Sequence, residues 1–390
     1  MRNLFLQHIA QTSENPMNLE VKKASGIYIT ITDGKRYIDL ISGIGVSNMG
    51  HRNHRVANAI RKQVGKYWHT MVYGEHIQSP QVKLAQKLTS LLPPSLNSCY
   101  FVNSGSEAIE GALKLAKRFT GKTKIVAMKN AYHGSTHGAL SLMNNNYFTE
   151  AFRPLLPNVH FAEFNNEENL NLIDEQTACV VLEIVQAEAG YLAPNPDFLE
   201  NVRERCNQTN TLLIVDEIQT AMGRTGSLFA FEQYNLVPDI ICLAKAFGGG
   251  MPLGAFVANK NTMQCLTDNP VLGHITTFGG HPVSCAAAFE NLKVLTTSGL
   301  IKEVSKKEEL FRNLLQHPEI VEITGKGLML GVQLKSKEKL QKTVDYCLQK
   351  GLMIDWFLFA EDKLRIAPPL IITLNEIKKS CKIILEGLER

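Results

Sequence analysis

An alternation of short apolar runs with helical segments fills the middle of the chain and constrains its fold more than any other feature. The runs, rich in β-branched and aromatic residues, lie at 98–102, 124–128, 178–185, 211–217, 239–244 and 254–258. Before and between them lie segments with helical spacing, as at 79–92, where we expect Ser79 as the N-cap and Pro80 as the first helical residue. Helices that alternate with apolar strands predict an α/β fold with a mostly parallel, helix-covered sheet.

The pattern changes after an alanine-rich segment at 283–299. Shorter strands, such as 328–334 and 363–368, are separated there by charged helices, which predicts a second, smaller α+β domain. Thr373 and Glu376 fit a capping box and mark the start of the last helix.

The first fifty residues have no strand–helix alternation of their own. The segment 26–41 has the pattern of two strands around an Asp-Gly turn. We expect this region to pack with the C-terminal part of the chain. The expected division is a large domain at 50–290 and a small α+β domain formed by 1–49 together with 291–390.

The composition argues against several classes of function. The chain has 390 residues and a net charge of +4, and no apolar stretch approaches the roughly 20 residues that span a bilayer. No apolar secretory segment is visible, so we expect a cytoplasmic protein. Lys and Arg alternate with Glu, which does not favour nucleic acid as a partner. The eight cysteines form no C-x-x-C pair, so we expect reduced thiols and no metal site.

Lys245 follows the run at 239–244 and stands shortly before three glycines at 248–250. An ammonium group at the end of a buried strand is costly unless it is paired or deprotonated, and burial lowers its pKa toward that of a nucleophilic amine. A structural ion pair, or a side chain that reaches solvent, would explain a lone lysine equally well. Asp216, however, lies at the end of the run at 211–217, and ligands of open parallel sheets bind at the carboxyl ends of strands. The two opposite charges are therefore expected in one crevice.

The segment 103–106 (Asn-Ser-Gly-Ser) leads from a predicted strand into a predicted helix. Backbone N–H groups at a helix start bind anions such as phosphate, although the same residues also fit an ordinary N-cap. Tyr132 and His133 follow another predicted strand and could lay a ring over a planar cofactor, or simply pack in the core. A lysine, a carboxylate and an anion cradle are together what a pyridoxal phosphate cofactor requires.

Five motifs occur in order along the chain: NSGSEA (103–108), YHG (132–134), VDEIQTAMGRTG (215–226), LAKAFGGGMPLGA (243–255) and TTFGGHP (276–282). With these motifs the chain resembles the class III pyridoxal phosphate-dependent aminotransferases, the acetylornithine/ornithine aminotransferase group, over nearly its whole length. The resemblance implies a fold type I transferase like aspartate aminotransferase. Such a fold has a large domain with a mostly parallel seven-stranded sheet and a smaller α+β domain.

The resemblance also implies which residues hold the cofactor. Lys245 would bind its aldehyde covalently and move the proton during catalysis, and Asp216 would pair with its pyridine nitrogen. Gln219 would face its phenolic oxygen. Gly105 and Ser106 would hold its phosphate.

The resemblance implies further residues that contact the cofactor ring, the cofactor of a partner subunit, or the substrate. Tyr132 would stack on the ring, and Thr277 would reach the phosphate of the neighbouring subunit's cofactor, which implies a homodimer with shared sites. Arg365 would bind the α-carboxylate of glutamate or 2-oxoglutarate, and Glu188 would pair with this arginine for other substrates; either could instead belong to a surface ion pair. Ser135 stands where acetylornithine enzymes carry an arginine.

The implied reaction is ping-pong transamination, in which an amino group moves from an ω-amino acid type donor, acetylornithine-like or ornithine-like, to 2-oxoglutarate. Acetylornithine, ornithine, 4-aminobutyrate and lysine are all open as donors. The alternatives are an aminomutase or decarboxylase of the same fold, or a non-catalytic protein that keeps the cofactor-binding fold.

Overall fold

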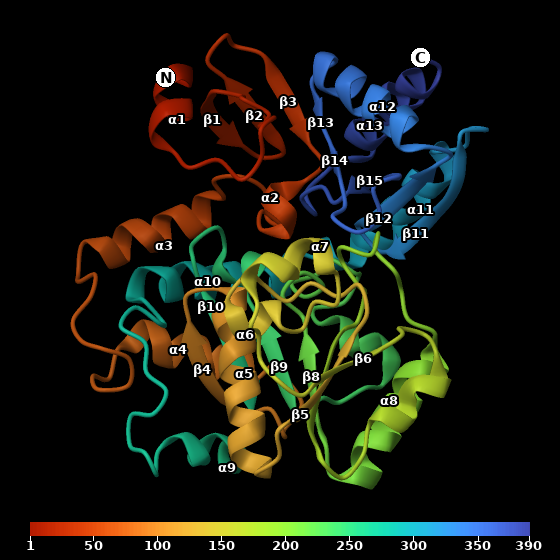
Figure 1. The fold of residues 1–390 in the computed structure, drawn as a ribbon. Helices are drawn as coiled ribbons and strands as arrows, with labels where there is room; N and C mark the ends of the chain where they lie inside the picture. The colour runs from red at the N-terminus through yellow and green to blue at the C-terminus, as the bar shows by residue number, and fades with distance from the viewer.

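A seven-stranded sheet forms the centre of the lower part of the molecule in Figure 1, a computed structural model that describes all residues 1–390. Its strands, in spatial order, are β4 (Ser98–Val102), β10 (Gly254–Ala258), β9 (Ile240–Leu243), β8 (Leu212–Asp216), β7 (Thr177–Glu183), β5 (Lys124–Met128) and β6 (Val159–Ala162). β10 runs antiparallel to both of its neighbours, and the other strand pairs are parallel. The prediction of a mostly parallel seven-stranded sheet is confirmed.

Burial on both faces explains why these strands appear in the sequence as continuous apolar runs. All residues of β7 are buried, and they alternate between two hydrophobic clusters. Val180 and Leu182 belong to the larger core, whereas Cys179 and Val181 belong to the core beneath helix α5 (Gly105–Thr120). Because neither face meets water, the strands need no alternation of polar and apolar residues.

Helix α5 begins and ends at residues that can cap it. Ser104 Oγ accepts the N–H of Glu107 at 3.2 Å, and Gly121 adopts a left-handed φ of 68° just beyond the last turn. β4 leads directly into α5 and runs in the same direction as β9, since both are antiparallel to β10. The start of α5 therefore lies at the carboxyl edge of the parallel strands.

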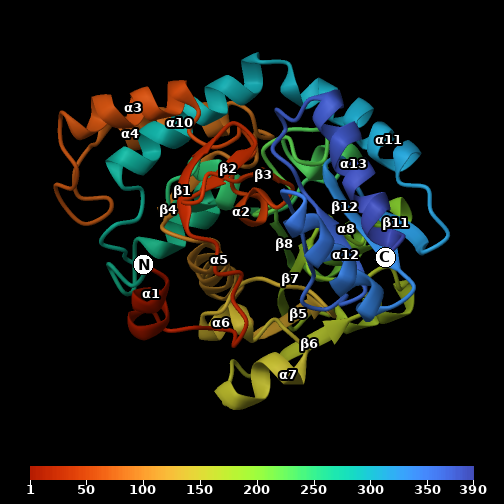
Figure 2. The ribbon, with the colours of Figure 1, turned by 90° about the horizontal axis from the view of Figure 1, so that it is seen from above.

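Two smaller sheets form the upper part of the molecule (Figure 1). The first contains β1 (Val21–Ser25), β2 (Tyr28–Ile31), β3 (Arg36–Asp39) and β13 (Leu352–Met353), and the second contains β11 (Ile320–Lys326), β12 (Met329–Leu334), β15 (Lys363–Ile366) and β14 (Asp355–Trp356). β3 and β13 pair in parallel, so the N-terminal strands join the C-terminal part of the chain. Seen from above, the N-terminal strands and the C-terminal elements lie side by side (Figure 2).

The other α-helices are α1 (Arg2–His8), α2 (Ser42–Gly45), α3 (His54–Val64), α4 (Ser79–Thr89), α6 (His137–Leu140), α7 (Asn146–Thr149), α8 (Pro196–Thr209), α9 (Lys260–Met263), α10 (Pro282–Thr297), α11 (Val304–Leu314), α12 (Lys337–Gln349) and α13 (Leu374–Leu388). Short 3₁₀ helices lie at Glu150–Phe152, Glu167–Leu172, Ala230–Tyr234, Lys245–Gly248, Gln264–Leu266 and Leu300–Glu303. α10 packs against α3 and α4. None of the helices has the length and hydropathy that a membrane crossing would require.

Some local expectations hold and others do not. The predicted capping box of α13 is present, with Thr373 and Glu376 each accepting a backbone N–H of the other. Helix α4 begins one residue earlier than expected, because Ser79 is already helical and Gln78 occupies the N-cap position without a side-chain bond. The sequence patterns do not predict β1, which is mostly exposed and polar, or β6, which has only four residues.

Candidate active site

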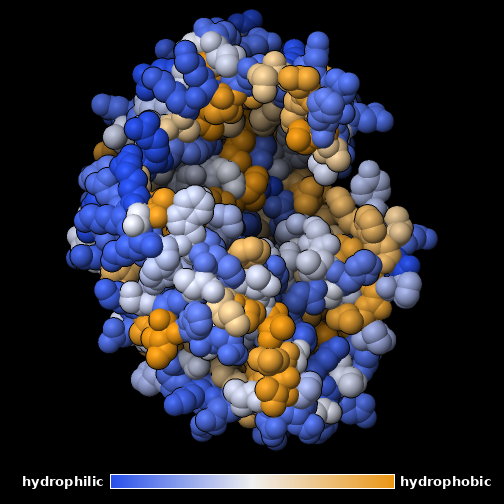
Figure 3. All heavy atoms as spheres, turned by 90° about the vertical axis from the view of Figure 1, so that its left-hand side faces the viewer, coloured by the Kyte–Doolittle hydropathy of each residue, from blue (hydrophilic) through white to orange (hydrophobic).

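A cavity of about 440 Å³ lies at the carboxyl edge of the parallel strands. Six of the seven residues that the resemblance assigns to the cofactor line it: Gly105, Ser106, Tyr132, Asp216, Gln219 and Lys245. In the space-filling view the molecule is hollowed between its upper and lower parts (Figure 3). Side chains from separate strand ends are thus brought to one place, as expected for an open parallel sheet.

Lys245 follows β9 directly and lies within the cavity. Its φ is 49°, in the left-handed region that residues other than glycine rarely adopt, so the local backbone is strained at this position. Burial lowers the pKa of its amine below the ordinary value of 10.5, and the negative charge of Asp216 only partly offsets this effect. An amine that is readily deprotonated can act as a nucleophile and as a base.

Asp216 is held by neighbours other than Lys245. Its Oδ1 accepts the N–H of Ile218 at 2.9 Å, and its Oδ2 lies 2.7 Å from His133 Nδ1. Burial alone would lower the pKa of His133, but the hydrogen bond and charge of Asp216 outweigh it and raise this pKa. The carboxyl of Glu183 lies nearby, and burial raises its pKa to about 7 against the opposing effect of His133. Of the two interpretations left open for His133, this geometry favours packing, because its ring is buried against Asp216 at the edge of the cavity.

The start of α5 also lines the cavity. The N–H groups of Gly105 and Ser106 have no acceptor within the helix, as is general for the first turn. Ser106 lies so close to Gly134 that a Cβ atom at Gly134 would come within 2.1 Å of Ser106 Oγ. Tyr132 also lines the cavity, and its hydroxyl lies 3.2 Å from Ser135 Oγ. An anion at the helix start would meet free N–H donors and the positive end of the helix dipole.

Arg365 and Glu188 do not line the cavity but pair with each other. Arg365 Nη2 donates to Glu188 Oε1 at 3.0 Å and to Oε2 at 2.8 Å, and both side chains are buried. Asp355 forms a second ion pair with Arg365, with 3.4 Å between Asp355 Oδ1 and Arg365 Nε. The charges of Glu188 and Arg365 act in opposite directions on the pKa of Lys245, so the pair is close enough to influence the cavity.

Thr277 lies outside this cavity, on an exposed loop between η5 (Gln264–Leu266) and α10. Its neighbour Phe278 exposes 55% of its surface, and Ile275 exposes the same share. The structure therefore does not bring Thr277 together with the other predicted site residues of the same chain.

The family model described as Aminotransferase class-III matches residues 9–388, nearly the whole chain. The chain belongs to the class III aminotransferases. The resemblance inferred from the five motifs is confirmed, and the protein is an enzyme, a transaminase.

This aminotransferase is similar to curated and solved relatives over its full length. It is 36% identical to the acetylornithine aminotransferase of Archaeoglobus fulgidus, over 97% of this chain and 98% of that protein. It is 37% identical to the acetylornithine aminotransferase of Methanopyrus kandleri, over 98% of this chain and 96% of that protein. The ornithine aminotransferase of Toxoplasma gondii, whose active site holds pyridoxal phosphate at partial occupancy, superposes with a TM-score of 0.92 at 27% identity, covering 99% and 93% of the two chains.

The cavity of this aminotransferase fits the family's cofactor, pyridoxal phosphate. Lys245 supplies an amine that makes no hydrogen bond or ion pair with Asp216, whose oxygens bind His133 and Ile218. The start of α5 supplies unpaired N–H groups for a phosphate. Asp216, held by a contact of 2.7 Å between its Oδ2 and His133 Nδ1, supplies a buried carboxylate for a pyridine nitrogen.

Sequence reasoning missed three side chains that complete the site of this aminotransferase. Glu183 had a usable signal, because it ends a buried strand and pairs in register with Asp216 on the next one. Asp355 had none, because its strand is two residues long and is defined only by pairing with the strand of Arg365. Tyr191 had none either, since only the fold places it against Gln219.

Proposed function

We propose that this aminotransferase moves an amino group from an ω-amino acid type donor to 2-oxoglutarate by a ping-pong mechanism. The observation that carries the proposal is the convergence of Lys245, Asp216 and the start of α5 on one cavity. A nucleophilic amine, a buried carboxylate and an anion site are the three groups that pyridoxal phosphate chemistry needs.

The positions of these residues around one cavity support the cofactor-holding roles. Bound pyridoxal phosphate supplies an electron-withdrawing ring that stabilises negative charge on the substrate carbon that bears the amino group. Lys245 Nζ would hold the cofactor covalently until the amine of the donor displaces it, and the freed Nζ would then accept a proton from that carbon and later return one. Asp216 keeps the pyridine nitrogen protonated. Gln219 faces the phenolic oxygen.

The remaining cofactor contacts involve the phosphate and the ring face. Gly105 and Ser106 bind the phosphate through the start of α5, and Tyr132 covers the ring. Thr277 serves the cofactor of a second copy of the chain, so each cavity of the homodimer is completed by its partner. The exposure of Thr277 and Phe278 supports this assignment.

The acceptor is recognised through a carboxylate. The guanidinium of Arg365 is planar and has several N–H donors that can bind a carboxylate. Its Nη1 atom is buried and has no hydrogen-bond partner in the protein. Glu188 neutralises Arg365 when the substrate has no carboxylate at that place, and the observed ion pair supports this role. Ser135 cannot bind a carboxylate as an arginine would, so a donor carboxylate must find another partner.

A donor panel tests the proposal. Purified holoenzyme is mixed with acetylornithine, ornithine, 4-aminobutyrate or lysine, and loss of the visible cofactor band reports the first half-reaction. Addition of 2-oxoglutarate should then restore the band and form glutamate. Carbon dioxide release or an isomerised amino acid without glutamate would instead indicate a decarboxylase or an aminomutase, and would contradict the proposal.

A further inference from the structure

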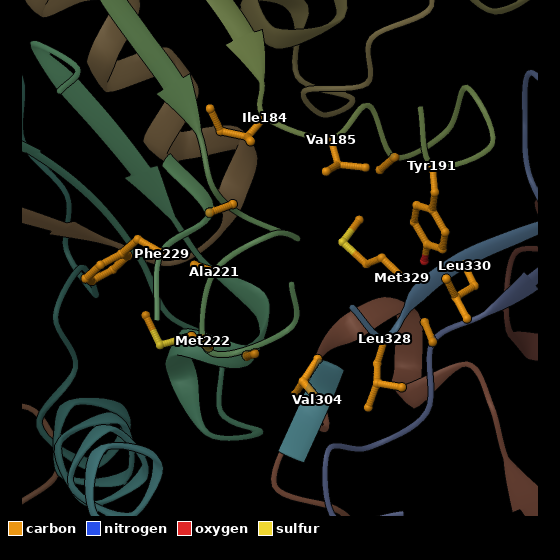
Figure 4. Close-up of a cluster of buried hydrophobic side chains, with 14 of the residues drawn as sticks. Ile184, Val185, Tyr191, Ala221, Met222, Phe229, Val304, Leu328, Met329 and Leu330 are labelled. Carbon is orange, nitrogen blue, oxygen red and sulfur yellow. The ribbon is translucent and has the colours of Figure 1, made fainter. Parts of the chain in front are cut away.

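Tyr191 lies outside the cavity but contacts a residue that lines it. Its side chain is fully buried, and Figure 4 shows it among apolar side chains that include Met329 and Leu330 of β12. A hydroxyl group in such surroundings needs a hydrogen-bond partner. The partner is Gln219, whose Oε1 accepts the Tyr191 hydroxyl at 3.0 Å.

Several contacts fix the side chain of Tyr191. Its backbone has a φ of 55°, which a bulky residue adopts only where its surroundings impose it. Its ring packs edge-on against the ring of Phe357, with 4.7 Å between the ring centroids. The guanidinium of Arg365 lies over the same Phe357 ring. Burial raises the pKa of the Tyr191 hydroxyl, so the group keeps its proton, and the hydrogen bond directs this proton at Gln219 Oε1.

The side chain of Gln219 is similarly restricted. Gly45 approaches it so closely that a Cβ atom at Gly45 would lie 3.3 Å from Gln219 Cγ. A carboxamide has an acceptor oxygen on one side and a donor nitrogen on the other. Because Tyr191 occupies the oxygen, the Nε2 donors of Gln219 are left for the cavity that this residue lines.

We propose that Tyr191 is a positioning residue that fixes the amide of Gln219 with its N–H donors toward the cofactor. The inference rests on the proposed function, in which Gln219 faces the phenolic oxygen of pyridoxal phosphate. An N–H donor stabilises negative charge on that oxygen, whereas a flipped amide would place two acceptor oxygens against each other. In the structure the hydroxyl of Tyr191 donates to Gln219 Oε1 and so holds the amide in the first of these two orientations.

The test is the pH dependence of the visible absorbance of the holoenzyme with Tyr191→Phe, which removes only the hydroxyl. Without the fixed donor, the more negative, deprotonated form of the bound cofactor is less stable. The pH midpoint of the absorbance change should therefore rise by about one unit, the scale of one hydrogen bond to a charged group. An unchanged midpoint in a variant that binds the cofactor normally would overturn the proposal.

A double variant separates positioning from other effects. Gln219→Ala removes the amide, so Tyr191→Phe should cause no further shift in that background. Equal shifts in both backgrounds would mean that Tyr191 acts independently of Gln219, and would also overturn the proposal. Tyr346→Phe is a matched control, because it removes a hydroxyl that donates to Glu386 at 3.0 Å between α12 and α13. It should leave the midpoint unchanged.

Failure of the proposed function gives a different result. If the wild-type protein gains no visible band with pyridoxal phosphate, or if no amino donor bleaches that band, the proposed function and the role of Gln219 fail together. A normal wild-type band with no effect of Tyr191→Phe overturns the positioning role alone.

Discussion

The ionisable side chains around the cavity control one another's charge. The hydrogen bond to Asp216 raises the pKa of His133 despite its burial, whereas burial lowers the pKa of Lys245. The site thus favours a positive charge at His133 and a neutral amine at Lys245. The proposed chemistry needs a deprotonated amine at Lys245, because only a neutral amine can attack.

Glu217, next to Asp216 in the chain, allows a prediction about stability. It is fully buried and accepts the N–H of Phe231 at 2.8 Å, and burial raises its pKa to about 8 from an ordinary value of 4.5. A raised folded-state pKa stabilises the protein at low pH, and this contribution is lost as the pH rises from about 4.5 to about 8.

Glu217→Gln removes this titration while keeping an acceptor oxygen for Phe231. As the pH rises from 5 to 8, the free energy of unfolding should fall in both proteins. The fall should be smaller in the variant than in the wild type, by about 1–4 kcal/mol. Denaturant unfolding of both proteins at the two pH values measures the difference. Parallel losses in the two proteins would show that Glu217 is already ionised in the folded state over this range, as it is in the unfolded chain, and that its pKa is not raised.

At the scale of elements, the strand ends and the start of α5 bring the site together. Local signals could predict them, since Lys245 and Asp216 both stand at the ends of buried runs and Ser104 precedes a helical pattern. Contacts made only by folding could not be predicted. His133 and Asp216 are 83 positions apart, and no spacing rule relates them. Tyr191 and Gln219, 28 positions apart, are likewise joined only by packing.

The close approach of Gly134 to Ser106 at the start of α5 yields a second prediction. Gly134→Ala would place a methyl group 2.1 Å from Ser106 Oγ, at a φ of 132° that disfavours any side chain. Displacement of Ser106 should weaken cofactor binding about tenfold or more, which corresponds to a loss of about 1.4 kcal/mol. Titration of the apoprotein with pyridoxal phosphate gives the affinity.

Gly121→Ala provides the matched control at the other end of α5. Gly121 also has a positive φ, but a Cβ atom there would meet nothing within 4 Å. This variant should lose stability, by about 1 kcal/mol, without losing cofactor affinity. Equal loss of affinity in both variants would contradict the role given to the start of α5.

At the scale of the whole molecule, the loop before α10 exposes large apolar side chains, and no contact within a single chain covers them. Val271 and Leu272 expose 70% and 59% of their surfaces, and Ile275 and Phe278 expose 55% each. Large apolar side chains exposed together in one loop often mark a protein interface. The proposed homodimer would cover it and would place Thr277 at the partner's cavity. The division into 50–290 and 1–49 with 291–390 stays a prediction.

Mixed dimers test the shared sites. A Lys245→Ala chain and a Thr277→Asp chain should each be nearly inactive alone. A mixed dimer contains one cavity with an intact Lys245 from one chain and an intact Thr277 from the other, so a random mixture should recover about a quarter of the wild-type activity. Coexpression with two different affinity tags isolates the mixed dimer. A purified mixed dimer without activity would refute sharing between subunits.

Borohydride reduction of the holoenzyme, followed by peptide mass spectrometry, tests most directly whether Lys245 and the groups around it form a pyridoxal phosphate site. Reduction makes the bond between lysine and cofactor permanent. We expect one phosphopyridoxyl group per chain, on the peptide that contains Lys245. Attachment at another lysine, or a protein that binds the cofactor and carries no group after reduction, would contradict the account.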